Sequence, residues 1–182
     1  MKQTDLSTFS NHTYAPGAPR SIRVLWYLVN AVFFMSRFPF GSFKVFLLRR
    51  FGARVGKGVV IKPSVNIKSP WHLEIGDYTW IGESVWIDNL VPVRIGAHAC
   101  LSQGAMLLTG NHDYKKSTFD LITGEITIEA GAWIGAKSIV CPGVRCGSHS
   151  VLAVGSVTAA DLEPFWIYRG NPATKVRQRV VE

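Results

Sequence analysis

The side chain best suited to proton transfer near neutral pH is histidine, and this chain of 182 residues contains five. They are His12, His72, His98, His112 and His149. His112 stands apart because the segment that follows it, residues 113–127, lacks the regular pattern of its surroundings. A histidine at the edge of regular structure and roofed by a loop is well placed to act as a general base. A hydrogen bond that anchors the loop is the alternative role for the same side chain.

Several polar side chains could orient His112 or bind a substrate beside it. Three flank the histidine and two lie about one coil, or three repeat units, earlier: Asn111, Asp113, Tyr114, Asp88 and Asn89. Carboxylates and amides accept or donate the hydrogen bonds that hold an imidazole or a hydroxyl group. For Asp88 and Asn89, a solvated turn is an equally good interpretation.

The elements that position these residues follow a six-residue period. An aliphatic or small apolar side chain recurs at Val55, Ile61, Ile67, Ile75, Ile81, Ile87, Ile95, Leu101, Leu107, Ile128, Ile134, Val140, Cys146 and Leu152. A helix would space apolar residues by three and four, and a half-buried strand would alternate them, so neither fits. Six residues suit one short strand and one turn, and three such units close a coil of eighteen residues.

The stacking of coils predicts where four of the histidines lie. The predicted coils are 55–72, 75–92 and 95–112, with the pattern resuming at 128. Neighbouring coils would pair as strands do, about 4.8 Å apart, with the aliphatic side chains inside. His98 and His149 fall on outward corners. His72 and His112 each close a coil, so we expect them along one edge of the prism.

Three segments of different composition are predicted. They are a polar leader and helical cap over 1–54, a β-helix over 55–163 with the inserted loop 113–127, and a strand followed by a short basic helix over 164–182. Two helices are expected on either side of Phe38–Gly41. The apolar run Ile22–Met35 is shorter than the roughly 20 residues of a membrane span. Residues 21–51 therefore either cap the open end of the coils or dock on a membrane surface.

Composition only partly restricts the kinds of ligand or surface that the protein could bind. Nucleic acid is not expected despite the net charge of +8, because the basic residues form no tight run with interleaved aromatics. A membrane surface, an anionic glycan or the phosphates of CoA fit the charge equally well. Cys100, Cys141 and Cys146 follow the repeat, which indicates reduced thiols, and their spacing predicts no metal site. The start lacks a signal-peptide layout, so we expect a cytoplasmic protein, at the inner face of the membrane if residues 21–51 bind lipid.

The repeat resembles that of the hexapeptide-repeat acyltransferases. The similarity rests on the aliphatic series, the small residue at the fifth place of most units, and the segments Thr109–Tyr114 and Trp133–Gly135. It implies a left-handed parallel β-helix and a homotrimer with its active site between subunits. It also implies that His112 removes a proton from an acceptor hydroxyl, which then attacks acetyl-CoA directly, without an acyl-enzyme.

Within that family, the chain looks most like acetyltransferases of exopolysaccharide clusters of the colanic acid type. The likeness extends over residues 1–182 and includes the polar leader, the aromatic and basic segment, and the loop sequence Ser117–Gly124. The implied acceptor is a sugar hydroxyl, on a free sugar or on a lipid-linked oligosaccharide.

The resemblance also implies where CoA binds. The residues at the matching places are Trp133, Gly135, Ala136, Val154, Ala159, Lys175 and Arg177. Val154 replaces a smaller residue of the family, and Ala159 stands where relatives often have lysine. Trp133 would serve equally well in a subunit contact, and the two basic residues in a solvated helix.

Other functions remain open at this point. The same fold could acetylate serine, an antibiotic or an amino sugar, or it could be a catalytically silent scaffold. A zinc enzyme of the carbonic anhydrase type would need several histidines from adjacent chains. Only His72 and His112 are expected on one edge, which argues against it.

Overall fold

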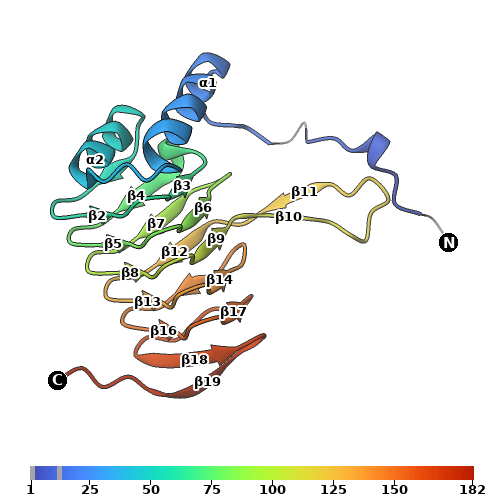
Figure 1. The fold of residues 1–182 in the computed structure, drawn as a ribbon. Coiled ribbons are helices and arrows are strands. Elements are labelled where there is room, and N and C mark those ends of the chain that lie inside the picture. The colour runs from blue at the N-terminus through green and yellow to red at the C-terminus, as the bar shows by residue number, and fades with distance from the viewer. Residues whose placement is uncertain (1–2, 12–13) are drawn as a thin grey trace.

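Three parallel sheets form the walls of a prism, and two helices cover one of its ends (Figure 1). The computed structural model describes residues 3–11 and 14–182. Successive turns of the chain contribute one short strand to each sheet, so the strands pair between coils. The result is the parallel β-solenoid that the six-residue period predicts.

The strands of the first sheet are β1 (Arg54–Val55), β4 (Leu73–Ile75), β7 (Val93–Ile95), β12 (Ile126–Ile128) and β15 (Arg145–Cys146). Those of the second are β2 (Val60–Ile61), β5 (Trp80–Ile81), β8 (Cys100–Leu101), β13 (Trp133–Ile134), β16 (Val151–Leu152), β18 (Trp166–Gly170) and β19 (Ala173–Gln178). Those of the third are β3 (Asn66–Ile67), β6 (Trp86–Asp88), β9 (Met106–Leu108), β14 (Ile139–Val140) and β17 (Val157–Thr158). A separate antiparallel pair consists of β10 (Gly110–His112) and β11 (Leu121–Thr123).

The predicted aliphatic series lies inside the prism. In the second sheet Ile61 pairs with Ile81, Ile81 with Leu101, and Leu101 with Ile134, and all four are buried. Full burial of such a side chain is worth about 1.5–3 kcal/mol relative to exposure. These ladders therefore hold the coils in register and give the site a rigid support.

Left-handed turns form the corners of the prism. His98 and His149 occupy two of them, each with φ of 57°. Their rings stack on adjacent coils, His98 on Tyr78 of the preceding coil at 5.3 Å and His149 on Phe165 of the following one at 4.7 Å between ring centroids. Gly104 takes an equivalent turn with φ of 67°, which glycine adopts without a Cβ clash. The corner positions expected for the two histidines are confirmed.

The two helices expected beside the Phe38–Gly41 turn are present. They are α1 (Arg20–Val29), which continues into a π-helical segment (Asn30–Phe34), and α2 (Gly41–Arg50). Trp26, Phe34 and Leu48 are buried against the end of the prism, and the Trp26 indole donates a 2.8 Å hydrogen bond to the carbonyl of Ile67. Within the described part of the chain, no helix has the length and apolar character needed to cross a membrane.

The insertion after His112 is a hairpin rather than a plain loop. β10 and β11 pair antiparallel, with His112 opposite Leu121. β12 has already rejoined the first sheet at Ile126, where it pairs with β7 and then with β15. The predicted boundaries 113–127 are therefore wrong at the C-terminal side, because residues 126 and 127 belong to the prism.

The short basic helix predicted over residues 174–182 is also wrong. Residues 173–178 form β19, which pairs antiparallel with β18 at the C-terminal end of the prism. β18 would otherwise present a row of unpaired backbone groups, and this strand pairing satisfies them.

His72 and His112 do not share an edge. Leu73 pairs with Val93, and Val93 pairs with Ile126. The residues equivalent to His72 in the next two coils are therefore Pro92 and Glu125, which precede those partners. His112 lies on the hairpin, which leaves the stack before that position is reached. No group of three or more His, Cys, Asp or Glu side chains suitable for a metal ion occurs among residues 3–11 and 14–182.

Candidate active site

The hairpin β10–β11 carries His112 away from the prism at the corner between the third and first sheets (Figure 1). Its root is fixed by Thr109, which is fully buried. The Thr109 hydroxyl donates to the carbonyl of Asp88 at 2.8 Å and accepts from the backbone N–H of Leu90 at 2.9 Å. The Gly124 N–H closes the root by donating to the carbonyl of Thr109 at 2.9 Å. The base of the hairpin is thus tied to the coil that precedes it.

The ring of His112 is half-buried and held on two sides. Its Nδ1 lies 2.9 Å from the carbonyl oxygen of Phe119, and the two rings stack with centroids 4.4 Å apart and planes at 7°. A carbonyl oxygen only accepts, so Nδ1 carries the proton of the neutral ring and Nε2 is left with a free lone pair. This tautomer is the one that a general base at Nε2 requires.

The N-terminal leader forms the other side of the histidine site. The ring of Phe9 lies 5.8 Å from that of His112, and the backbone N–H of Asp5 donates to the carbonyl of Ser117 at 2.8 Å. A 3-10 turn, Leu6–Thr8, connects the two contacts, and the Asp5 carboxylate caps it by accepting from the N–H of Ser7 at 3.0 Å. The leader is therefore part of the site rather than a loose segment.

The residues that flank His112 shape the turn of the hairpin. The Asn111 side chain accepts from the His112 backbone N–H at 2.8 Å, and Asp113 accepts from the N–H of Lys115 at 3.1 Å. Tyr114 is 75% exposed, so its hydroxyl is free to meet a ligand. The imidazole is oriented by the Phe119 carbonyl, and none of these side chains takes that role.

Asn89 is a structural residue. It is fully buried, its amide donates to the Ser69 carbonyl at 2.6 Å, and its Oδ1 accepts from the Ser69 N–H at 3.0 Å. Both polar groups are thus used inside the prism, and the predicted role in substrate binding is wrong. Asp88 differs: its carboxylate is half-buried and forms an ion pair with Lys68 at 2.7 Å.

A cavity of about 430 Å³ lies between the leader, α1 and the prism, beside this ion pair. Its polar and aromatic lining includes Tyr14, Arg23, Asn66, Lys68 and Trp71. Burial raises the pKa of Tyr14, an effect that Arg23 opposes and the Asp88 charge reinforces. The cavity therefore combines aromatic walls with cationic groups, which suits a sugar or an anionic sugar derivative.

The cavity borders the histidine hairpin. Leu90 lines it, and the same side chain packs over Gly110 at the start of β10. A larger groove, of about 710 Å³, runs over the outer face of the first sheet between Arg54, Arg94 and Glu129. Residues of the hairpin do not line that groove, so the smaller cavity is the better candidate for an acceptor site.

The predicted CoA-binding residues lie on three parts of the molecule. Trp133 is 45% exposed on the second sheet, and its indole donates to the Ser102 hydroxyl at 2.8 Å. Gly135 and Ala136 follow it at the corner between the second and third sheets, next to the exposed Val154 of the following coil. A Cβ at Gly135 would lie 2.6 Å from the Val154 nitrogen, so this close approach of two coils requires glycine.

The other three predicted CoA residues are separate from this corner. Ala159 is exposed after β17, on the corner from which the hairpin emerges two coils earlier in the stack. Lys175 and Arg177 are on β19, and Lys175 already binds Glu163 at 2.6 Å and lies 3.8 Å from the Trp166 ring centroid. The third sheet separates the Trp133 corner from the His112 hairpin within one chain.

Comparison with known proteins identifies relatives by sequence and by fold. A protein described as a colanic acid biosynthesis acetyltransferase, WcaF of Escherichia coli K12, is 40% identical over 178 residues, which are 97% of each chain. The chain belongs to the hexapeptide-repeat acetyltransferases. Its solenoid is accordingly the left-handed parallel β-helix of this family, as predicted.

Two further relatives extend the comparison. The galactoside O-acetyltransferase of E. coli K12 is 26% identical over 136 residues, 72% of this chain and 66% of the relative. A hexapeptide-repeat-containing acetyltransferase of Vibrio cholerae, solved with acetyl-CoA, has a TM-score of 0.79 at 25% identity and covers 88% of each chain. The chain matches no family model.

The sequence predicts His112 as the base but does not indicate the groups that contact its ring. Phe9 and Phe119 come from segments that have no repeat pattern, so no spacing pointed to them. The cavity residues Tyr14, Arg23 and Trp71 come from three segments that only the fold brings together.

Proposed function

We propose that this protein transfers an acetyl group from acetyl-CoA to a sugar hydroxyl in exopolysaccharide biosynthesis of the colanic acid type. His112 acts as the general base. The observation that carries the assignment is the hydrogen bond from His112 Nδ1 to the Phe119 carbonyl, which leaves Nε2 free to accept a proton. The pathway rests on the 40% identity to the colanic acid relative.

The reaction needs one base and no covalent enzyme intermediate. His112 Nε2 takes the proton of the acceptor hydroxyl while the hydroxyl oxygen attacks the thioester carbonyl of acetyl-CoA. The C–S bond then breaks, the ester forms, and the proton passes from the imidazolium to the CoA sulfur. The Phe119 carbonyl keeps its hydrogen bond throughout and stabilises the imidazolium once it forms.

The cysteines support direct transfer. Burial raises the pKa of Cys100 and of Cys141, and it raises that of Cys146 to about 12. A thiol nucleophile acts as the thiolate, so each of these shifts makes the group less reactive at neutral pH.

The acceptor is assigned to the cavity between the leader and α1. Trp71 and Tyr14 offer ring surfaces to a sugar, and Arg23 and Lys68 offer positive charge. Asp88, paired with Lys68, the exposed Asn111 and Tyr114, and the half-buried Asp113 are the side chains assigned to position the acceptor near the hairpin.

A homotrimer is proposed because the two halves of the site lie apart in one chain. CoA is assigned to the edge formed by Trp133, Gly135, Ala136 and Val154, with Ala159, Lys175 and Arg177 as further contacts. Because the third sheet separates this edge from His112, a neighbouring subunit would supply one of the two. The lipid-linked acceptor and a place at the inner face of the membrane remain proposals of the same kind.

The test is thiol release from acetyl-CoA with a panel of neutral sugars, acidic sugars and amino sugars, followed by identification of the acetylated product. Release that requires a hydroxyl sugar and yields an ester supports the proposal. An amide formed on an amino sugar, or no release with any acceptor including a lipid-linked oligosaccharide, contradicts it.

A further inference from the structure

Helix α1 and the π-helical segment that continues it are apolar on the face turned away from the prism as well as on the face that packs against it. We call the outer face the apolar stripe: Ile22, Leu25, Leu28, Val32 and Met35. Its members are spaced by three or four residues and are 39–57% exposed, whereas the inner face buries Trp26 and Phe34. A surface helix of a globular protein normally has charged or polar residues on the outer face.

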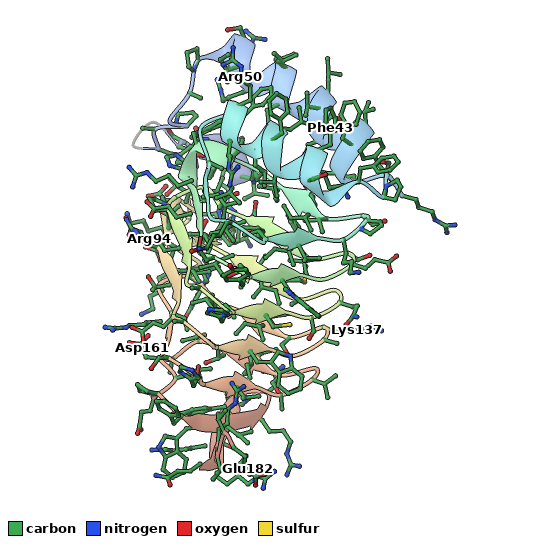
Figure 2. All side chains as sticks on the ribbon, turned by 90° about the vertical axis from the view of Figure 1, so that its left-hand side faces the viewer. Phe43, Arg50, Arg94, Lys137, Asp161 and Glu182 are labelled. Carbon is green, nitrogen blue, oxygen red and sulfur yellow. The ribbon has the colours of Figure 1, made fainter. Side chains whose placement is uncertain are left out.

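Aromatic rings extend this surface onto α2. Phe33, Phe38, Phe40, Phe43 and Phe46 form a chain of ring contacts with centroids 5.2–6.1 Å apart. Phe40 and Phe46 are 63% and 59% exposed. Figure 2 shows Phe43 at the helical end of the molecule, opposite Glu182 at the other end.

Positive charge is concentrated in the N-terminal part of the chain, which contains the helices. Residues 6–73 contain ten Lys and Arg side chains and no Asp or Glu, whereas the remainder of the chain carries ten basic and twelve acidic side chains. The net charges of the two parts are therefore +10 and −2. Arg20, Arg37, Arg49 and Arg50 are exposed around the helices, and Arg50 is at the outer end in Figure 2.

We propose that the helical end docks on an anionic lipid bilayer, with the apolar stripe and the exposed phenylalanines in the headgroup region and the arginines on lipid phosphates. Apolar side chains flanked by arginine are the composition of an interfacial helix. A second copy bound face to face would bring two strongly positive ends together, which disfavours self-association through this surface.

This orientation gives the acceptor cavity a position near the membrane. Arg23, Tyr27 and Met35 of the helical segment line the cavity, so it opens beside the stripe. If the acceptor is lipid-linked, which rests on the proposed function, it reaches the cavity from the bilayer on which the protein sits.

Vesicle co-sedimentation tests the docking independently of any activity. The probes are vesicles of phosphatidylcholine alone and of phosphatidylcholine with phosphatidylglycerol, at low and high salt. We expect binding to the anionic vesicles that weakens with salt. The double variant Leu28→Glu/Val32→Glu should lose this binding, and Arg37→Gln/Arg50→Gln should weaken it by about fivefold for each charge removed.

The matched control is Val180→Glu, at the C-terminal end of the chain, where the side chain is 81% exposed. It should bind as the wild type does, and all variants should keep the wild-type molar mass by light scattering. Absence of wild-type binding to anionic vesicles, or equal loss in Val180→Glu, overturns the proposal. A change of molar mass in Leu28→Glu/Val32→Glu would instead assign the stripe to a contact between subunits. Failure of thiol release with intact vesicle binding would leave the docking in place and reject only the proposed function.

Discussion

Replacement of Asn89 by alanine tests the distinction between a structural and a substrate-binding amide. Asn89 makes two hydrogen bonds to the Ser69 backbone, and both residues are buried. Alanine leaves one donor and one acceptor without partners, at about 1–3 kcal/mol each. The expected loss in the free energy of unfolding is therefore about 4 kcal/mol. For a chain of this size that lowers the melting temperature by about 12 °C.

Two further variants sharpen the result. Asn89→Asp keeps the shape but places a carboxylate oxygen against the Ser69 carbonyl, so it should destabilise at least as much as alanine. Asn111→Ala removes an exposed amide and should change the free energy of unfolding by less than about 0.5 kcal/mol.

The assay is thermal unfolding at fixed protein concentration, with acetyl transfer measured well below the melting temperature. An Asn89→Ala protein that melts with the wild type but has a raised KM for the acceptor would refute the structural assignment.

Three other predictions follow from single contacts. Burial lowers the pKa of Lys44 in the folded protein. At pH values between this lowered pKa and the ordinary pKa of lysine, the unfolded chain binds more protons than the folded one, so the free energy of unfolding rises with pH. The free energy of unfolding of Lys44→Met, measured against pH, should lack this rise. Trp133→Ala should raise the KM for acetyl-CoA more than it lowers kcat, whereas Trp80→Ala, at the same outward place two coils earlier, should leave KM unchanged; equal effects would remove Trp133 from the CoA edge. Phe9→Ala removes a ring beside His112 and should lower kcat by roughly tenfold through a less ordered base, whereas Leu6→Ala, 63% exposed, should not; identical kcat values in both variants would show that the leader is dispensable.

The regular part of the fold could be predicted because one physical rule repeats. Each inward residue of the period, such as Ile61 or Ile134, must be buried, and its neighbours in space are its equivalents in the adjacent coils. Periodicity alone therefore fixed both the core and the strand register. The same rule placed His98 on a corner, because the corner is a fixed number of residues after the inward side chain.

Most of the errors lie where the period stops. The sequence 174–182 is basic and without glycine, which favoured a helix. Its backbone instead forms hydrogen bonds with the otherwise unpaired edge of β18. Asn89, within the periodic part, was predicted to bind substrate or to occupy a solvated turn, whereas its burial depends on Ser69, one coil away. The partners of His112 come from the hairpin and the leader, whose packing is decided by tertiary contacts.

The most direct test of the central claim is the initial rate of thiol release from saturating acetyl-CoA with an active sugar acceptor, compared between wild type and His112→Ala. A general base that acts at Nε2 contributes about 10²–10⁴ in rate, so the variant should lose at least that factor while keeping its melting temperature and molar mass. A variant that retains a rate within a few fold of the wild type would contradict the assignment of His112 as the base.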